Sequence, residues 1–367
     1  MAPTIVVTGY PGFLGSALLP RLLAREPDAE AVCIVQDRFA DLALGRADEQ
    51  MAADPAIAGR IRCIVGDITD PALGLEAEAY RDLASTTTSI HHLAAVYDLT
   101  VPLDLATTVN VDGTRHVVSF AQACDALERL HYVSTCYVSG RHTGIWREDD
   151  LIRPGQVFNN HYESTKHHAE VVVREAMATG LRATIYRPAV VAGDSRTGDT
   201  QKLDGIYFVI RWLLRQPSWL AVVPTMGDPT TVRFNVVPRD HVIDAIVELS
   251  GRSDTVGKCF ALADPEPFTI AEMMDRLGDA TGRRLVRLRL PKRVAKGALA
   301  HVPGVEAVMG IPADAADYFT HPTFYDTSNA DAALAGTGIM RWDRDEWIRA
   351  LVAFTSDHMA MSSDPMI

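Results

Sequence analysis

Short apolar runs alternate with longer amphipathic stretches through the first half of the chain. The runs are rich in valine and isoleucine, as buried strands are, and the stretches between them carry apolar residues at helical spacing. Strands that alternate with helices predict an α/β fold, in which helices cover both faces of a parallel sheet. The expected strands lie at 4–8, 31–35, 61–65, 89–95, 129–135 and 182–188.

The pattern changes after Pro188, where an aromatic-rich helical stretch at 203–216 is followed by one more strand–helix pair and a short strand at 258–264. A chain of 367 residues is longer than one hydrophobic core usually serves, so we expect two lobes. The first is a Rossmann-like doubly wound parallel sheet, and the second is a smaller, mostly C-terminal substrate lobe. The expected ranges are 1–189 rejoined by about 232–263 for the sheet domain, 190–231 and 264–355 for the lobe, and 356–367 for a flexible tail.

Composition limits the classes of protein that this chain can represent. The net charge is −12, from 35 basic and 47 acidic residues, which argues against a general binder of nucleic acid or anionic membrane. Five scattered cysteines without a C-x-x-C pair are typical of reduced cytosolic thiols. The chain has no run of 18 apolar residues and opens on a strand-like run, so we expect a cytoplasmic protein without a membrane span.

The segment VVTGYPGFLGS, 6–16, places three glycines directly after the first expected strand and at the start of a helix. Glycine lets the backbone turn sharply and approach a pyrophosphate, and a helix N-terminus offers N–H donors and the positive end of a dipole. The segment therefore predicts a dinucleotide-binding loop, with the spacing G-x-x-G-x-x-G. The expected contacts are Thr8, Gly9, Gly12, Phe13, Leu14 and Gly15.

The end of the second strand should select between NAD and NADP. An acidic residue there favours NAD, whereas a basic residue pairs with the 2′-phosphate of NADP. The chain has Gln36, Asp37 and Arg38 at this place. Arg38 could reach the 2′-phosphate, whereas Asp37 would repel it, so these residues do not indicate a single cofactor. We expect NADP(H) to be favoured, with NAD(H) as the alternative. The other expected cofactor contacts are Asp67 and Ile68 after the third strand and Ala94 and Ala95 after the fourth.

The segment HYESTKHHAE, 161–170, is rich in histidine, but it does not predict a metal site. His167 and His168 diverge by about 100° on a helix, and His161 and His168 are two turns apart. Tyr162 and Lys166 are different, because a spacing of four places both on one helical face. An ammonium near a phenol lowers the pKa of the tyrosine, which can then exchange a proton with a carbonyl or alcohol near neutral pH.

Several segments in order resemble one family, the extended short-chain dehydrogenase/reductases, over residues 4 to 265. They are TGYPGFLG, GDIT, HLAA, NVDGT, YVSTCYVSG, YESTK and RPAVVAGDSRTG. The resemblance implies that Tyr162 is the general acid/base, and that Lys166 lowers its pKa and holds the nicotinamide ribose. Ser134 and Thr135 close the fifth strand at the edge where such sheets bind ligands. By resemblance Thr135 orients the substrate oxygen, with Ser134 beside it.

The same resemblance implies that Asn110 lies near the active site and that Pro188 ends the strand beside the nicotinamide. Within the family, GYPGFLGSALL and RPAVVAGDSRTG are most similar to the branch of fatty acyl reductases, male-sterility proteins and thioester-reductase domains. We expect the chain to differ from that branch in having no carrier-protein domain, and Gln36 stands where the branch often has arginine. A homodimer is a further implication of the resemblance.

These observations predict an NAD(P)H-dependent reductase or dehydrogenase that acts on a small carbonyl compound, an aldehyde, ketone or acyl thioester. The alternatives are a nucleotide-sugar epimerase or dehydratase of the same superfamily, and a cofactor-binding regulator without catalysis. Four aromatic residues after the sheet domain would suit an apolar substrate, or they pack the lobe core; the sequence leaves both open. Cys136 could attack a thioester, although a cysteine at such a place more often packs. The four aromatic residues are Tyr207, Phe208, Trp212 and Trp219.

Overall fold

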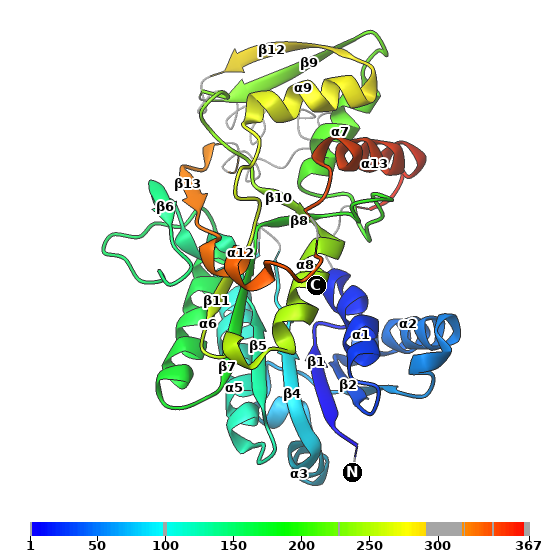
Figure 1. Cartoon of the computed structure of the whole chain (residues 1–367), viewed down its shortest axis with the longest axis vertical. Coiled ribbons are helices and arrows are strands. Elements are labelled where there is room, and N and C mark those ends of the chain that lie inside the picture. The colour runs from blue at the N-terminus through cyan, green and yellow to red at the C-terminus, as the bar shows by residue number, and fades with distance from the viewer. Residues whose placement is uncertain are drawn as a thin grey trace.

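The structure is a computed structural model that describes residues 2–97, 101–226, 228–290, 318, 320–339 and 341–362. A seven-stranded parallel sheet forms the lower part of the molecule in Figure 1. The strand order is β11-β7-β5-β4-β1-β2-β3, so the chain runs outward from β1 to β3 and then returns to β4 on the other side of β1. The carboxyl ends of β1 and β4 therefore border the crevice in which doubly wound sheets bind ligands. The strands are β1 (Thr4–Thr8), β2 (Glu30–Val35), β3 (Ile61–Val65), β4 (Thr87–His92), β5 (Arg129–Val133), β7 (Ala183–Pro188) and β11 (Cys259–Leu262).

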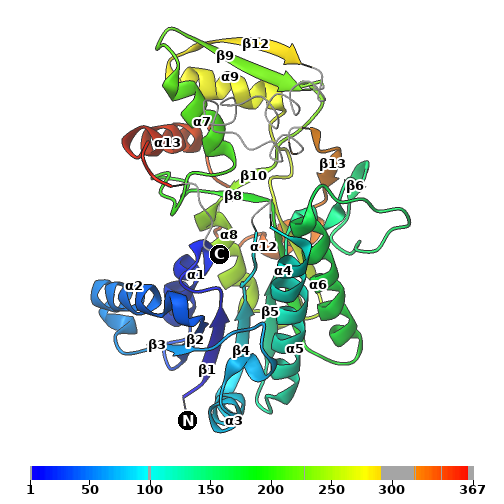
Figure 2. The ribbon, with the colours of Figure 1, turned by 180° about the vertical axis from the view of Figure 1, so that it is seen from behind.

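Helices cover both faces of this sheet, as the opposite views in Figures 1 and 2 show. Successive residues of β1 alternate between two cores: Ile5 and Val7 pack with α1, α2 and α8, and Val6 packs with α3, α5 and α6. The predicted α/β, Rossmann-like, doubly wound fold is thereby confirmed. The helices are α1 (Phe13–Arg25), α2 (Ala40–Ala53) and α8 (Arg239–Ser250) on one face, and α3 (Ala77–Thr86), α5 (Gly113–Ala123) and α6 (His161–Ala178) on the other.

Two expected strands end earlier than the apolar pattern indicates. β4 ends at His92, because Leu93 and Ala94 leave the sheet and pack against the backbone of Gly9. β5 ends at Val133, and the next residues turn into the site described below. Apolar character alone did not mark the end of β4, because Leu93 and Ala94 are apolar although they lie beyond the strand and are only partly buried.

A third core, formed by α7, β9, α9 and α13, makes the smaller lobe at the top of Figure 1. Tyr207 of α7 is buried in this core, and its hydroxyl accepts a hydrogen bond from Gly193 N at 2.8 Å. Trp219, in contrast, is 72% exposed. The lobe elements are α7 (Ile206–Arg215), β9 (Leu220–Met226), α9 (Ile270–Thr281), β12 (Arg284–Leu290) and α13 (Arg344–Asp357). Further short elements are α4 (Leu103–Ala106), β6 (Gly144–Trp146), β8 (Val190–Ala192), β10 (Val236–Pro238), β13 (Thr323–Tyr325) and α12 (Ser328–Leu334).

The structure differs from the expected division of the chain at two places. α12 lies within the range expected for the lobe, but it packs against β11 and α8, because buried Glu148 accepts hydrogen bonds from Ala261 of β11 and from the first N–H groups of the helix. The expected tail begins inside α13, which continues to Asp357, and Met361 packs against the lobe core. Residues 291–317 and 363–367 of these ranges lie outside the described residues.

Candidate active site

The glycine loop between β1 and α1 is packed so tightly that side chains would not fit. Gly9 has φ +87°, a left-handed conformation that favours glycine, and a Cβ there would lie 2.7 Å from Ala94 N. A Cβ on Gly12 or Gly15 would lie 2.8 Å or 2.5 Å from Gly9 O. Gly12 is also the N-cap of α1 and has no side chain to cap it, so the N–H groups of the first turn remain for a ligand. The loop therefore suits the diphosphate of a dinucleotide.

A chain of buried hydrogen bonds joins this loop to the next part of the site. Thr8 Oγ1 lies 2.7 Å from His92 Nδ1, and His92 Nε2 lies 3.0 Å from Thr114 Oγ1. Thr114 donates its proton to Asn110 O at 2.6 Å, so it accepts from His92 Nε2–H, and Nδ1 accepts from Thr8. Burial lowers the pKa of His92 to about 3, which keeps the ring neutral. One tautomer of His92 thus connects β1, β4 and α5.

Asn110 lies on a π-helical turn, Thr107–Asp112, between α4 and α5. Its Oδ1 accepts from Val96 N at 2.8 Å, and its Nδ2 donates to Val96 O and to Thr165 Oγ1, both at 3.0 Å. The buried amide therefore ties the loop after β4 to α6, the helix that carries Tyr162. The side-chain oxygen and nitrogen of Asn110 are thus both engaged by protein atoms.

The residues expected at the adenosine end lie together at the ends of β2 and β3. Gln36 Nε2 donates to Asp67 Oδ2 at 2.7 Å, and Arg38 Nη2 donates to Gln36 Oε1 at 2.6 Å. Asp67 also accepts from Thr69, and Ile68 is buried against Gly113. Gln36 is thus the link between an acidic and a basic side chain, and the guanidinium of Arg38 is exposed.

Tyr162, Thr135 and Lys166 come together at the carboxyl ends of β5 and β7. The side chain of Tyr162, in the first turn of α6, is hydrogen-bonded to that of Thr135, whose hydroxyl also donates to Pro188 O at 3.4 Å. Lys166 Nζ donates to Val133 O at 2.8 Å. The structure therefore brings the predicted acid–base residues together with Pro188. Ala94 and Ala95, both partly exposed, follow β4 on the neighbouring part of the same edge.

The electrostatics of this pair differ from the expectation. Burial raises the pKa of Tyr162 to about 12, and the hydrogen bond with Thr135 opposes this rise only in part. Burial lowers the pKa of Lys166 to about 7, against the charge of Glu170, and its ammonium lies 4.5 Å above the ring of Tyr132. The protein alone therefore keeps the phenol protonated at neutral pH, and does not lower its pKa as the four-residue spacing predicts, because Lys166 points to Val133 O.

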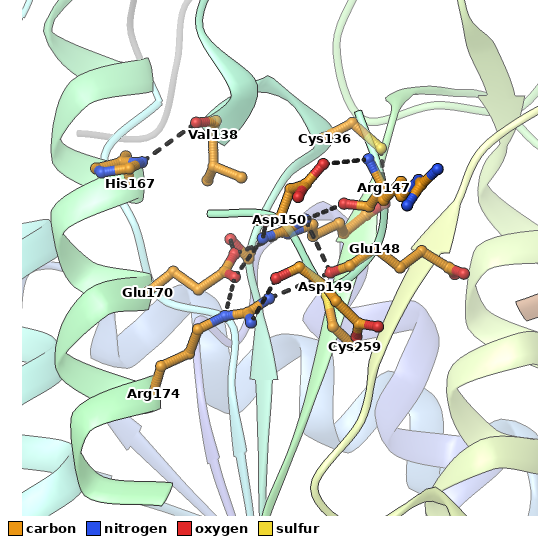
Figure 3. A network of polar contacts seen from close by, with 12 residues as sticks. Cys136, Val138, Arg147, Glu148, Asp149, Asp150, His167, Glu170, Arg174 and Cys259 are labelled. Carbon is orange, nitrogen blue, oxygen red and sulfur yellow. Dashed lines mark hydrogen bonds and ion pairs between the residues drawn. The ribbon is translucent and has the colours of Figure 1, made fainter. Parts of the chain in front are cut away.

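Ser134 takes part in a buried ion-pair network, which Figure 3 shows around Glu170 and Arg174. Its Oγ donates to Glu170 Oε2 at 2.6 Å, and Arg187 binds both oxygens of the same carboxylate, with Nη2 to Oε1 at 2.6 Å. Burial opposes ionisation, but the charge and hydrogen bonds of Arg187 lower the pKa of Glu170 to about 2. Because its proton is held by Glu170, Ser134 supports the strand ends, and Thr135 is the hydroxyl that faces Tyr162.

Glu170 and Thr114 were not among the predicted site residues, although they lie in the segments HYESTKHHAE and NVDGT. Glu170 follows Lys166 by four residues, and that spacing was the available signal. Cys136 is buried, its Sγ donates to Arg187 O at 3.0 Å, and burial raises its thiol pKa, so its environment is that of a packing residue. Among the described residues, no three histidine, cysteine or acidic side chains are grouped to bind a metal ion, and no helix is long and apolar enough to cross a membrane.

Comparison with known proteins agrees with this geometry. A family model for NAD-binding domains, described as male sterility protein, matches residues 7–246. The chain belongs to this family. Membership of the extended short-chain dehydrogenase/reductases, in the male-sterility and thioester-reductase-like branch, is thereby confirmed, and the glycine loop is part of a nicotinamide-cofactor domain.

Three relatives illustrate the similarity. One of the subunits of the linear gramicidin synthase from Brevibacillus parabrevis is 30% identical over 71% of this chain and 5% of its own length. The L-2-aminoadipate reductase large subunit from Penicillium chrysogenum is 29% identical over 67% of this chain and 18% of its own. The terminal R domain from the myxalamid PKS-NRPS biosynthetic pathway has a TM-score of 0.81 at 28% identity, over 99% of this chain and 93% of that chain. This chain thus spans a small part of these curated relatives and nearly all of the solved domain.

Proposed function

We propose that this chain is an NAD(P)H-dependent reductase that converts an aldehyde, ketone or acyl thioester, with Tyr162 as the proton donor. The observation that supports this most is the Tyr162–Thr135 hydrogen bond at the carboxyl end of β5, with Lys166 one helical turn away. The glycine loop lies at the same edge of the sheet, two strands away. The similarity to an L-2-aminoadipate reductase and to the terminal R domain supports the same class of reaction.

Each residue of the site has a distinct part in this reaction. A bound nicotinamide cofactor would supply a hydride to the carbonyl carbon. Thr135 and Tyr162 hold the carbonyl oxygen, and the Tyr162 proton passes to that oxygen. The raised pKa of Tyr162 suits this direction, because the phenol still carries its proton at neutral pH. With an acyl thioester, the C–S bond then breaks, and a thiol and an aldehyde are released.

Lys166 has a separate role in this proposal. Its amine has a pKa lowered to about 7 by burial, and it points along the strand end to Val133 O. A cofactor ribose at the crevice would offer hydroxyl partners to this amine, which is the role that the family resemblance implies. We propose that Lys166 turns from Val133 O to the ribose when the cofactor binds.

We further propose that NADP(H) is the preferred cofactor. Arg38 is exposed at the end of β2 and can pair with a 2′-phosphate through two N–H groups. Gln36 holds the guanidinium in place by accepting from both Nε and Nη2. The carboxylate of Asp67 is at the same time engaged by Gln36 and Thr69, so it is not turned to the phosphate.

The test is a panel of aldehydes, ketones and acyl-CoA thioesters with NADPH and NADH, followed at the nicotinamide absorbance with wild type and Tyr162→Phe. We expect cofactor oxidation with at least one carbonyl class, and its loss in the variant. Epimerisation or dehydration of a nucleotide sugar, without net cofactor oxidation, would support the epimerase alternative instead. Cofactor binding without turnover of any compound would favour a regulator.

A further inference from the structure

A small cavity lies next to Tyr137, a residue close to the proposed proton donor. Its wall includes Tyr137, which follows Thr135 by two residues. The backbone N–H of Tyr137 donates to Thr135 Oγ1 at 3.3 Å. The other wall residues that matter here are Arg233, Asn235, His321 and Tyr325. The cavity volume of about 30 Å³ is more than one ordered water needs, so a small polar group fits without a rearrangement of the fold.

His321 in this wall has an unused hydrogen-bonding atom. The side chain is 5% exposed, and its Nε2 lies 2.9 Å from the hydroxyl of Tyr325. Its Nδ1 is buried and has no hydrogen-bond partner in the part of the chain that the structure describes. Buried polar atoms without partners are rare in proteins, and each calls for a ligand or a functional reason. His321 is therefore the strongest indication that something binds here.

The chemistry of the wall favours a hydrogen-bond acceptor as the ligand. His321 Nε2 and the Tyr325 hydroxyl share one hydrogen bond, and in the tautomer in which Tyr325 donates, the ring proton of His321 lies on Nδ1. Burial and the charge of Arg141 keep the ring neutral by lowering the pKa of His321 to about 3. Arg233 is a donor-only group, of which one N–H binds Pro267 O at 2.6 Å. A group with oxygen lone pairs would match both donors.

The charges around the cavity agree with this choice. Among the described residues, Arg233 lines the cavity and the charge of Arg141 acts on His321. The buried carboxylate of Glu163 acts on Tyr137 from the side of α6, where Asn159 donates two hydrogen bonds to it. Asn235 uses its amide on the backbone of Asp264 and adds no charge.

The cavity is coupled to the catalytic helix through the segment that carries His321. Asn160, the N-cap of α6, donates its Nδ2 to the hydroxyl of Tyr318 at 3.0 Å, and the ring of Tyr318 meets that of Tyr137 edge to face at 4.8 Å. Tyr137 also meets the ring of His321, at 5.0 Å. The wall of the cavity is thus one aromatic layer away from Tyr162.

We propose that this cavity is a substrate subsite, in which His321 and Arg233 bind an acceptor oxygen, a carboxylate or an amide carbonyl, of the substrate at a distance from the reacting carbonyl. This rests on the proposed reductase function and gives that function a substrate class. The substrate carries a polar group beyond the reactive carbon and is not a plain alkyl aldehyde. Tyr207 was one of the aromatic residues that suggested an apolar substrate. Its side chain is buried in the lobe core.

The test compares aldehydes of one chain length that end in a methyl, an amide, a carboxylate or an ammonium group. We expect wild type to prefer the amide or carboxylate over the methyl end by about tenfold in kcat/KM, the factor that one hydrogen bond supplies. His321→Phe should lose this preference and keep its rate on the methyl-ended aldehyde within a few-fold. His321→Asn, which keeps an N–H near the place of Nδ1, should restore part of it.

His241→Phe is the matched control, because His241 Nδ1 is also buried without a partner among the described residues, but His241 does not line this cavity. It should leave the preference unchanged. An unchanged preference in His321→Phe, or a wild-type preference for the methyl or ammonium end, overturns the subsite while the reductase function stands.

Binding of the corresponding alcohols, measured by calorimetry, separates the two proposals further because it needs no turnover. We expect Tyr162→Phe to keep the wild-type preference for the carboxylate- or amide-ended alcohol over the methyl-ended one, and His321→Phe to bind the carboxylate- or amide-ended alcohol about tenfold more weakly than wild type. Equal affinity for wild type and His321→Phe would contradict the subsite whether or not any aldehyde is reduced.

Discussion

Tyr162 and Lys166 share one face of α6, yet each is held by a different neighbour. The phenol is hydrogen-bonded to Thr135, and the ammonium to the carbonyl of Val133. Burial favours the neutral form of both side chains. The phenol of Tyr162 is therefore protonated at neutral pH, and the amine of Lys166 has a pKa of about 7. The chemistry of these residues can therefore be tested one at a time.

Tyr162→Phe should lower kcat by about 10²-fold or more while cofactor affinity stays the same, because only the proton donor is lost. Steady-state kinetics and calorimetry measure the two quantities. Tyr80→Phe is the control, since Tyr80 packs its ring on Phe120 in the face of the sheet covered by α3 and α5. Activity of Tyr162→Phe within a few-fold of wild type would remove Tyr162 from the mechanism.

Arg38→Ala should weaken NADPH binding by about 1.5–3 kcal/mol, the range for a hydrogen bond to a charged group, and leave NADH nearly unchanged. The reason is that Gln36 carries no charge, so the 2′-phosphate depends on this guanidinium. Dissociation constants of both cofactors for both proteins decide the matter. Arg46→Ala, at an exposed pair with Glu49 on α2, should alter neither. A wild-type preference for NADH would contradict the NADP proposal alone.

At the scale of elements, the glycine loop depends on contacts between backbone atoms. Gly12→Ala places a methyl group 2.8 Å from Gly9 O, and neither backbone atom can move without shifting the loop. We expect cofactor affinity to fall at least tenfold, because the loop would no longer present its N–H groups in one geometry. From the sequence, Gly12 was expected to lack a side chain so that a pyrophosphate can approach the backbone. The structure adds that a side chain at Gly12 would clash with Gly9 O.

Gly45→Ala is the matched control for Gly12→Ala. Gly45 lies within α2, and a Cβ there would meet nothing within 4 Å. This change should raise the free energy of unfolding by about 0.5–1 kcal/mol, because alanine loses less conformational freedom in a helix. Calorimetry of the cofactor and denaturant unfolding measure both variants. Equal cofactor affinity in the two variants would show that the loop tolerates a side chain.

At the scale of the whole molecule, neutral histidines are buried in the middle of the sheet and at the lobe. Burial lowers the pKa of His91, His92 and His321 to about 3. Burial also lowers the pKa of His131, which stacks on His91 at 4.3 Å. Each folded pKa is below the unfolded value near 6.5, so the stability that these groups contribute is present above pH 6.5 and is lost as pH falls towards the folded values.

The free energy of unfolding should therefore fall as the pH decreases from about 6.5, by about 1.4 kcal/mol per pH unit for each histidine that charges on unfolding. Glu148 acts in the opposite sense, because burial raises its pKa from 4.5 to about 7. Between these two pH values it therefore offsets the slope that about one histidine contributes. His91→Phe should make the free energy of unfolding depend less steeply on pH, by the contribution of one histidine, about 1.4 kcal/mol per pH unit. Urea unfolding of wild type and variant across this pH range measures it, and an identical slope would contradict the assignment.

The sequence alone determined the class of fold and most of the site. Alternating strands and helices are local patterns, and a parallel sheet follows from them because each strand is buried on both faces. Tyr162 and Lys166 came from helical spacing, and the glycines from a turn that local backbone geometry requires. The same local rules could not find α12 on the sheet domain, because buried Glu148 holds it from a distant segment.

Tertiary structure decided which hydroxyl faces Tyr162 and how the pKa values of the site residues shift. Ser134 and Thr135 are adjacent and chemically alike, but one faces Glu170 and the other Tyr162, because successive residues at the end of a strand point in opposite directions. The pKa of Tyr162 rose although a lysine lies one turn away, since a pKa depends on burial and on where the neighbouring ammonium points. Burial and direction arise from contacts between segments far apart in the chain, and a linear pattern does not contain them.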